Sequence, residues 1–451
     1  MFSNMKILIL GMARSGVAAA KVLVKRNNEV IINDIKEEHD TEIVNELKEL
    51  GVKLVLGSHP ENIVDKSINY VIKNPGIKDD HILIKKAYDL GIPVINEVEL
   101  AYNLLPKDVT LIGITGTNGK TTTTTLTYEI MHKAFGDRVH LAGNIGYPLC
   151  SILDKLKEND IIVMEVSVQQ SVNFDKFHPH VALMTNYSPA HIDFLETYEN
   201  YKKTKAKMFY NQESTDIAIL NLNNIEVLDE LNNIKSIKKY FSSTDKANCY
   251  LKDNVIYYND EKVINTDIIK IPGMHNIENI LGAISIVKEF NVDNLVIKDV
   301  ISNFLGVEHR LEYVDEVNGV RFYNDTEATN IKCTQIALSS FNKPIIIILG
   351  GLERGQNFDD LIPFAKNIKV IIGIGACRER VREFGNKINV PTYIHEYLKD
   401  SFLDISNNIE SGDIVLLSPA SASWDQYKEC EVRGQEFKDL VKELKNGINK
   451  E

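Results

Sequence analysis

Short runs of Ile, Val and Leu alternate with longer amphipathic stretches along most of this chain. Each apolar run is bounded by Gly, Asn or Asp and is followed by a charged stretch, which is the pattern of a parallel sheet connected by helices. The first block contains KILIL, EVIIND, YVIKNPG and PVIN and ends near LLPKD. A second block opens with VTLIGITG and continues through DIIVMEVS, HVALMTN and IAILNLN. We predict a strand at each of these segments.

The pattern changes between about Thr244 and Ile271, where CYLKDNVIYYNDEKVIN indicates short polar strands and turns. IPGMHNIENILGAISIVKEF then predicts a helix. A third block holds GVRFYND, PIIIILGG, VIIGIG and DIVLLSP and closes with a charged helix. The chain is therefore predicted to be an α/β protein of three units, with a small β excursion after the second block and with unusual residues at strand ends.

Composition narrows the function classes. A chain of 451 residues with 44% hydrophobic content exceeds what one core usually supports, so two or three domains are expected. The net charge of −12 argues against a nucleic-acid partner and leaves a small anionic ligand open. No stretch approaches the roughly 18 apolar residues of a membrane span, and the first apolar run is too short for a secretory leader. The five cysteines are scattered and contain no CxxC pair, which favours a reducing cytoplasm; they are Cys150, Cys249, Cys333, Cys377 and Cys430. We also expect the protein to be a monomer.

The stretch GITGTNGKTTTTTL, between a predicted strand and a predicted helix, has the context of a phosphate-binding loop. Glycines let backbone N–H groups approach a phosphate, and a helix N-terminus adds partial positive charge. Lys120 would reach the β- and γ-phosphates of a nucleotide and Thr121 would bind magnesium. The strict GxxxxGK[ST] spacing is not met, because Ile114 stands six residues before Lys120, so a capped polar turn stays an alternative for this string alone. The predicted loop comprises Gly116, Thr117, Asn118, Gly119, Lys120, Thr121 and Thr122.

Glu165 closes the strand pattern DIIVMEVS. A carboxylate at the carboxyl end of a buried strand is placed as a magnesium ligand requires. A lone acid after a strand is more often a surface residue, so Glu165 gains weight only beside Lys120.

Seven motifs in order resemble the Mur ligases over essentially the whole chain. They are GTNGKTT, AGNIG, HID with Lys205 following, PGMHNIEN, EHRLE, YNDTEATN and LSPASASWDQY. The motifs are most similar to the branch of that family that adds D-glutamate to UDP-N-acetylmuramoyl-L-alanine. The resemblance implies a Rossmann-like UDP-sugar-binding domain over 1–106, a central P-loop ATPase-like domain over 107–310, and a Rossmann-like amino-acid-binding domain over 311–451.

The resemblance also implies the chemistry. Similar enzymes use ATP to phosphorylate a carboxylate, and an amine then attacks the acyl phosphate through a tetrahedral intermediate, in the cytoplasmic synthesis of peptidoglycan for cell shape and division. ATP and Mg²⁺ are the implied cofactors, with catalytic positions at Lys120, Asn144, His191 and Lys205. The implied metal ligands are Thr121, Glu165, His191 and Lys205, the last carbamylated, because CO₂ turns a cationic amine into an anionic oxygen ligand. From the residues alone, His191 would be a structural histidine and Lys205 a solvated charge.

Further positions follow only from the resemblance. The adenine and ribose contacts match Asn276, Asn279, Arg310 and Asp325, which without it suggest helix capping and a surface ion pair. ILGMARSG resembles a dinucleotide fingerprint with its middle glycine replaced by Ala13, a weak signal by itself. The UDP-sugar contacts match Arg14, Ser15, Asp34, Ile35, Lys36 and Gly76, and the remaining substrate positions match Asn144, Ser167, Thr329, Arg354 and Ser423.

Four positions depart from the family pattern. EVSVQQS places Val168 and Gln169 where a serine and a phenylalanine are usual, NDTEATN places Glu327 where a lysine is usual, and Cys430 stands where a phenylalanine is usual. An anion in place of a cation repels a carboxylate-bearing substrate. Three hypotheses therefore stay open: a D-glutamate-adding ligase, a related ligase with another amino acid or a folate-like acceptor, and a nucleotide-binding protein that has lost ligation.

Overall fold

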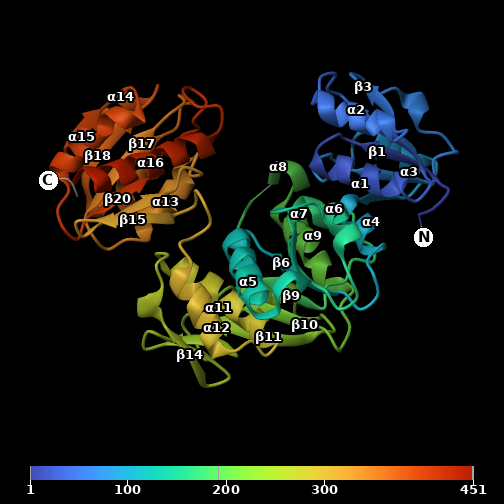
Figure 1. The fold of residues 1–451 in the computed structure, drawn as a ribbon, viewed down its shortest axis with the longest axis horizontal. Helices are drawn as coiled ribbons and strands as arrows, with labels where there is room; N and C mark the ends of the chain where they lie inside the picture. The colour runs from blue at the N-terminus through green and yellow to red at the C-terminus, as the bar shows by residue number, and fades with distance from the viewer. Residues whose placement is uncertain (1, 191, 449–451) are drawn as a thin grey trace. The chain divides into compact units, whose positions relative to one another are not determined.

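The computed structural model describes residues 2–190 and 192–448. The chain forms two compact units, one of Met1–Thr266 with Glu278–Val300 and the other of Asp267–Ile277 with Ile301–Glu451. Three sheets are distributed over these units, the first two in the first unit and the third in the second (Figure 1).

The first sheet is parallel and five-stranded, in the order β3-β2-β1-β4-β5. Each central strand is an unbroken apolar run because helices cover both faces of such a sheet, and Ile9 pairs with Ile32 on one side and Ile72 on the other. The strands are β1 (Lys6–Leu10), β2 (Glu29–Asp34), β3 (Lys53–Leu56), β4 (Tyr70–Lys73) and β5 (Val94–Asn96), and the helices are α1 (Arg14–Val24), α2 (Thr41–Glu49), η1 (Glu61–Ile63), α3 (Ile82–Asp89) and α4 (Glu97–Tyr102).

The second sheet is nine-stranded, in the order β14-β13-β12-β11-β10-β9-β6-β8-β7. Strands β6 to β12 pair in parallel, whereas β12, β13 and β14 form an antiparallel extension. The strands are β6 (Thr110–Thr115), β7 (Val139–Gly143), β8 (Ile161–Glu165), β9 (Val181–Met184), β10 (Ile217–Asn221), β11 (Ile237–Ser242), β12 (Cys249–Lys252), β13 (Val255–Tyr258) and β14 (Glu261–Asn265).

Many of the helices that follow these strands are short; of the three longest, α5 begins at the predicted phosphate loop, α9 contains Lys205 and α11 follows the antiparallel extension. They are α5 (Lys120–Phe135), η2 (Gly136–Arg138), α6 (Leu149–Ile152), η3 (Leu153–Lys155), α7 (Val168–Ser171), α8 (Ile192–Leu195), α9 (Tyr198–Tyr210), α10 (Ile225–Glu230), η4 (Thr266–Ile268), α11 (Met274–Lys288) and α12 (Asn294–Asn303).

The third sheet is six-stranded, in the order β15-β16-β20-β17-β18-β19, with only the β15–β16 pair antiparallel. Its strands are β15 (Glu312–Val317), β16 (Val320–Asn324), β17 (Ile345–Gly350), β18 (Ile368–Ile374), β19 (Thr392–Ile394) and β20 (Ile414–Leu417). The helices are α13 (Ile331–Ser339), η5 (Phe358–Asn367), α14 (Arg378–Lys387), η6 (Leu398–Ser401), α15 (Phe402–Asn408) and α16 (Cys430–Ile448). Two apolar clusters cover its two faces, as a doubly wound sheet requires.

Helix α4 joins the first two sheets through buried polar groups. Glu99 accepts hydrogen bonds from the backbone N–H groups of three consecutive residues, 175–177, at 2.9 to 3.1 Å. The Glu97 carboxylate accepts the N–H of Cys150, and the Asn96 amide donates to the carbonyl of Gln170. One apolar cluster runs from Phe2 to Leu231 through side chains of both sheets, so this part of the chain is compact.

The predicted α/β class is confirmed, and so are the parallel blocks and the antiparallel excursion. Each sheet lies within one of the three predicted ranges, while the boundaries of the three domains stay a prediction. The sequence reading missed strands that lie at or near sheet edges, including β3, β15 and β19. They lack long unbroken apolar runs because most of their residues are partly exposed to solvent.

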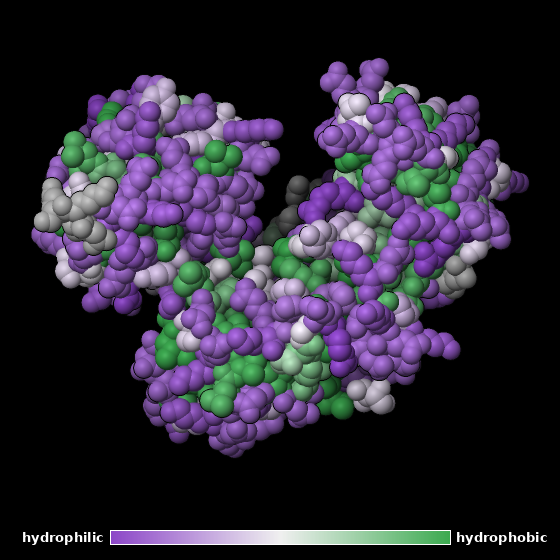
Figure 2. Space-filling model, in the orientation of Figure 1, coloured by the Kyte–Doolittle hydropathy of each residue, from purple (hydrophilic) through white to green (hydrophobic). Residues whose placement is uncertain are grey.

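The surface of the protein is mostly hydrophilic. In the orientation of Figure 2 hydrophilic side chains dominate, with hydrophobic residues in small separate patches. In the described part of the chain, no helix is both long enough and apolar enough to cross a membrane. The five cysteines are free thiols.

Candidate active site

The loop between β6 and α5 has a backbone that only glycine accommodates at two positions. Gly116 has φ +145° and Gly119 has φ +80°. A Cβ atom on Gly116 would lie 1.8 Å from the Oγ1 atom of Thr185, and one on Gly119 would lie 2.1 Å from the Oδ1 atom of Asn279. The loop is thus held close to its neighbours, with its N–H groups leading into the N-terminus of α5.

Two residues that directly follow strand β9 hold this loop in place through hydrogen bonds. Thr117 donates its N–H to the carbonyl of Asn186 at 2.8 Å, and Asn118 donates its N–H to the Asn186 side chain at 3.0 Å. Thr185 donates its hydroxyl to the carbonyl of Asn118 at 2.6 Å. The Lys120 ammonium donates to the carbonyl of Thr117 at 2.9 Å, so its positive charge lies over the loop. The loop therefore leads in a fixed conformation into the N-terminus of α5, where the first N–H groups of a helix can bind an anion.

Glu165 lies at the carboxyl end of β8, one strand away from the loop, where β6 pairs Ile114 with Glu165. The side chain is buried, and Oε1 accepts a hydrogen bond of 2.6 Å from the Asn144 amide. Its other oxygen, Oε2, is buried and has no hydrogen-bond partner. A buried carboxylate oxygen with an open coordination position is the donor that a divalent cation takes, so Glu165 fits the predicted metal.

Lys205 lies on α9 and is 1% exposed, although three other lysines share its segment. Its ammonium is 3.3 Å from the Thr115 hydroxyl and 5.1 Å from the centre of the Tyr201 ring. Burial, with the charge of Lys120 as a second cause, lowers the pKa of Lys205 well below its ordinary value, and Glu165 opposes this. The structure therefore brings Lys120, Glu165 and Lys205 into one electrostatic environment. The lysine is buried because Tyr201, Lys205 and Met208 share the inner face of the helix.

Four other predicted positions have different outcomes. His191 lies outside the described residues. Ser167 is the N-cap of α7 and forms a capping box with Gln170, so its hydroxyl is engaged in the helix start. Asn276 donates its amide to the carbonyl of Pro272 at 2.7 Å, in the second unit. Asn279, in the first unit, approaches Thr123 and Gly119.

The predicted nucleotide-sugar contacts gather in the first sheet. A cavity of about 620 Å³ at the carboxyl ends of β1, β2 and β4 is lined by Ser15, Asp34, Ile35 and Gly76. Asp34 accepts the N–H groups of Met12 and Lys36, at 2.7 and 2.9 Å, which fixes the loops on either side. Arg14 donates a hydrogen bond to the carbonyl of Gly146, which lies in the segment after β7. Four of the six predicted UDP-sugar residues thus line one cavity, and Arg14 and Lys36 lie next to lining residues in the sequence.

In the second unit, Asp325 and Arg310 occupy contrasting environments. Asp325 is buried and accepts hydrogen bonds from the Ser418 hydroxyl at 2.7 Å and the Leu311 N–H at 3.1 Å. Burial raises its pKa to about 7. Arg310 is largely exposed and its Nη2 atom lies 3.2 Å from Oε2 of Glu327. The cation predicted to contact the nucleotide is thus paired with the anion that departs from the family pattern.

The predicted amino-acid positions lie on loops of the same unit. The Arg354 guanidinium lies 4.7 Å above the Trp424 ring, which orients a flexible side chain. Ser423 is buried and its hydroxyl has no partner, whereas Thr329 is exposed. Cys430, Glu431 and Glu327 bring their ligand atoms within 4.8 Å of one another, so both departures in this unit lie together.

Sequence reasoning missed the residues that support the site. The Thr115 hydroxyl accepts a hydrogen bond from the Lys205 ammonium and donates one to the carbonyl of Val166. Thr185 and Asn186 form the hydrogen bonds that fix the loop. The sequence could have indicated some of them, because Thr185 and Asn186 in VALMTN, like Thr115 in GITG, are polar residues at the end of an apolar strand pattern.

The chain is similar to known proteins over most of its length. Residues 114–287 match the family model of the Mur ligase middle domain, and residues 5–96 match that of the MurD-like Mur ligase N-terminal domain. The UDP-N-acetylmuramoylalanine–D-glutamate ligase of Streptococcus agalactiae serotype III is 42% identical over 446 residues, 98% of each chain. The enzyme of that name from Geobacillus kaustophilus is 40% identical over 448 residues, 98% of this chain and 99% of its own.

Solved structures show the same fold at low identity. The UDP-N-acetylmuramate–alanine ligase of Thermotoga maritima aligns with a TM-score of 0.58 at 17% identity, covering 98% of this chain and 100% of its own. The MurF ligase of that organism, in complex with ADP, aligns with a TM-score of 0.57 at 14% identity, covering 98% and 96%. The chain belongs to the Mur ligase family and is a ligase. Within that family, the full-length relatives at 40 to 42% identity bear the name of the D-glutamate-adding enzyme.

Proposed function

We propose that this protein joins D-glutamate to UDP-N-acetylmuramoyl-L-alanine with ATP, in the cytoplasmic stage of peptidoglycan synthesis. The observation that carries the proposal is the buried Lys205 beside a phosphate loop and Glu165, in a chain that matches D-glutamate ligases over 98% of its length. Amide formation needs an activated carboxylate, and ATP supplies the activation.

The residues of the first unit have distinct roles in this reaction. The N–H groups after Asn118, at the start of α5, and the Lys120 ammonium bind the β- and γ-phosphates of ATP. A substrate carboxylate oxygen attacks the γ-phosphorus and ADP leaves, which gives an acyl phosphate. The amine of the amino acid then attacks the acyl carbon, and the tetrahedral intermediate expels phosphate as the amide forms. Lys120 stabilises the charge of the phosphoryl group as it is transferred.

Magnesium fits the residues around the loop. Thr121 and Glu165 would hold one ion, and Lys205, once carbamylated, would contribute to a second together with His191. The unpartnered Oε2 atom of Glu165 supports the first assignment. When bound, the metal supplies positive charge that offsets the charge of the phosphates.

The environment of Lys205 supports carbamylation. The lowered pKa of Lys205 increases the fraction of the neutral amine, and only the neutral amine attacks CO₂. The amine nitrogen bonds to the carbon of CO₂ and loses a proton, which leaves a carbamate with one negative charge. Lys120 disfavours an ammonium at Lys205, whereas it attracts the negative charge of the carbamate.

The remaining substrates are assigned by the predicted positions. The cavity at Ser15, Asp34 and Gly76 would hold the nucleotide sugar. In the second unit, Arg354 would bind a carboxylate of D-glutamate through two parallel hydrogen bonds, and Thr329 and Ser423 would contact the amino acid. Asn276, Asn279, Arg310 and Asp325 would contact the adenosine of ATP.

Phosphate release tests the proposal. The purified protein, Mg-ATP and UDP-N-acetylmuramoyl-L-alanine are combined with D-glutamate, L-glutamate, D-aspartate or no amino acid. Release that requires D-glutamate and Mg²⁺, and that Lys120→Ala abolishes, is the expected result. Release no greater than in the Lys120→Ala control would refute ligation. Release with another amino acid would refute the assignment of D-glutamate and make Glu327 and Cys430 the residues to revert.

A further inference from the structure

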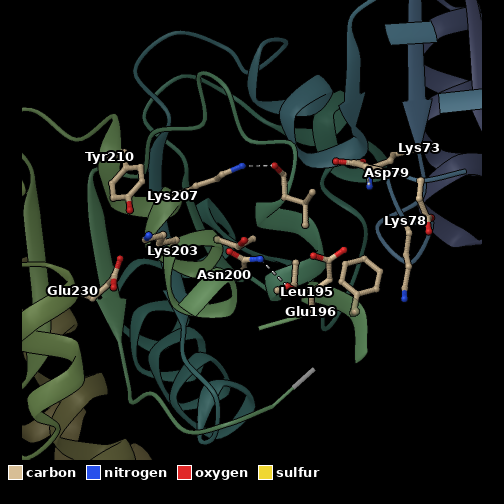
Figure 3. Close-up of a pocket in the computed structure, with 14 residues that line it drawn as sticks. Lys73, Lys78, Asp79, Leu195, Glu196, Asn200, Lys203, Lys207, Tyr210 and Glu230 are labelled. Atoms are coloured by element: carbon tan, nitrogen blue, oxygen red, sulfur yellow. Dashed lines mark hydrogen bonds and ion pairs between the residues drawn. The ribbon is translucent and has the colours of Figure 1, made fainter. Parts of the chain in front are cut away.

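Many basic side chains of this protein are engaged by other protein groups. A cavity of about 520 Å³ in the first unit contains two examples (Figure 3). Lys73 forms an ion pair of 2.9 Å with Asp79, and Lys207 donates to the carbonyl of Val172 at 2.6 Å. A basic side chain with such a partner is less available to an anionic ligand.

Arg354, in the second unit, is held in a different way. Among the described residues, no carboxylate lies within ion-pair distance of its guanidinium, and the neighbouring Glu353 pairs with Arg380 instead. The guanidinium lies over the Trp424 ring, 4.7 Å from the ring centre. A cation–π contact attracts the charge without using the N–H donors in hydrogen bonds. The ring therefore holds the cation while its donors stay open to a carboxylate.

The two residues come from loops that meet at one edge of the third sheet. Arg354 follows β17 and Trp424 follows β20, and these strands pair in parallel. The Gln356 side chain joins the loops, because its amide donates to the Ser421 hydroxyl and its oxygen accepts the N–H of Arg354 at 2.8 Å. The backbone on both sides is thus fixed, and the long arginine side chain depends on the ring for its direction.

Trp424 is exposed and lies next to a predicted substrate contact. The residue is 63% exposed, so it contributes little to the hydrophobic core. Ser423, the preceding residue, is buried and its hydroxyl has no partner, which is costly unless a ligand supplies one. We propose that Trp424 is a positioning residue that holds the Arg354 guanidinium in place for a carboxylate of the amino-acid substrate. This inference rests on the proposed function, in which Arg354 and Ser423 contact D-glutamate.

Trp424 is the single tryptophan of the chain, so the intrinsic tryptophan fluorescence comes from this position alone. With ADP and UDP-N-acetylmuramoyl-L-alanine present, D-glutamate is expected to change the emission in a saturable manner, because a carboxylate on the guanidinium alters the charge over the ring. Arg354→Ala is expected to abolish the change at D-glutamate concentrations that saturate the wild type. A constant emission from a wild-type enzyme that turns over D-glutamate would overturn the inference.

Steady-state kinetics test the coupling between the two side chains. Trp424→Ala is expected to raise the KM for D-glutamate about fivefold, with kcat and the KM for ATP within twofold of wild type. Trp424→Phe should keep most of the affinity, because an aromatic face remains. In an Arg354→Ala background, compared by kcat/KM for D-glutamate, Trp424→Ala should have no further effect, since the group it positions is gone. An equal effect in both backgrounds, or none in either, would overturn the inference.

Tyr397→Ala is the matched control. Tyr397 is an exposed aromatic residue of the same unit that has a cation–π contact of 5.7 Å with Lys399 and is not a predicted substrate position. Its replacement should leave the KM for D-glutamate unchanged. A rise as large as that of Trp424→Ala would show a general loss of packing and overturn the inference. Absence of turnover in the wild type would instead refute the proposed function, whatever the emission shows.

Discussion

Arg310 and Glu327 form an ion pair in the second unit, with 3.2 Å between Nη2 and Oε2. The arginine side chain is 56% exposed and the glutamate 30%. Glu327 stands where the family pattern has a lysine, and Arg310 is predicted to contact the nucleotide. Glu327 therefore offsets the positive charge of Arg310 in this region. Both side chains are accessible to solvent and to substrates.

Glu327→Gln and Glu327→Lys are expected to lower the KM for D-glutamate, the first by about threefold and the second by up to about tenfold, because each removes repulsion of a dianionic substrate. An exposed ion pair contributes only about 0.2 to 1 kcal/mol, so the melting temperature should change little. Steady-state kinetics and thermal unfolding measure both effects. Glu316→Gln, which breaks the exposed pair with Arg321, is the control. An unchanged KM in both variants would place residue 327 outside the substrate site.

Lys205→Ala is expected to lower turnover at least about 100-fold, because it removes the anionic oxygen ligand that a carbamate would supply. A short carboxylate such as formate should restore part of the activity by occupying the vacated space. Lys203→Ala, on the exposed face of the same helix, should retain normal turnover. Incorporation of isotope-labelled CO₂ into the wild type but not into Lys205→Ala would identify the carbamate directly. Wild-type turnover in Lys205→Ala would remove carbamylation from the mechanism.

Gly116→Ala is expected to weaken ADP binding at least about tenfold, since a Cβ atom 1.8 Å from Thr185 Oγ1 must displace the loop. Gly136→Ala is the matched control. Gly136 also has a positive φ, but nothing lies within 4 Å of the added carbon, so it carries only the backbone cost of about 1 to 3 kcal/mol. Calorimetric titration with ADP measures binding in both variants. Equal binding in the two would show that the loop tolerates the added carbon.

Glu97→Gln and Glu99→Gln, two residues apart on α4, are expected to have opposite effects on stability. Burial raises the pKa of Glu97 to about 7 from its ordinary 4.5. Between these two values the folded state binds more protons than the unfolded state, so this group lowers stability as pH rises through the window. Glu97→Gln removes the cost. It should match wild type below about pH 4.5 and exceed it by up to about 3 kcal/mol above pH 7.

Glu99 uses both carboxylate oxygens to accept N–H groups of the 175–177 segment. An amide at this position turns one acceptor into a donor that faces other donors, so Glu99→Gln should destabilise the protein by about 1 to 3 kcal/mol. Urea unfolding of both variants at pH 5 and pH 8 provides the comparison. If Glu97→Gln were less stable than wild type at pH 8, the ionised Glu97 carboxylate would stabilise the folded state and not destabilise it.

The unbroken apolar runs predicted most inner strands, because a strand covered on both faces needs apolar side chains, whereas the inner strand β11, IKKYFS, has no such run and was missed. Edge strands such as β19 carry no such constraint and were missed. Lys120 and Glu165 could be proposed from the sequence because one follows a predicted strand within a glycine-containing loop and the other ends a predicted strand, and their roles stay a prediction. The burial of Lys205 was not predicted from its lysine-rich segment. Its helical spacing from Tyr201 and Met208 could have indicated it. The Arg310–Glu327 pair depends on tertiary contacts that no local pattern encodes.

The buried polar groups of α4 have a consequence for synthesis on the ribosome. Asn96, Glu97 and Glu99 are translated before their partners at residues 150–177. At about 5 to 20 residues per second, those partners follow several seconds later. The strands of the first sheet can associate in that interval, but α4 has no acceptable place to bury its carboxylates until the middle segment has emerged. We therefore expect α4 of the nascent chain to stay hydrated until residues 150–177 have been synthesised.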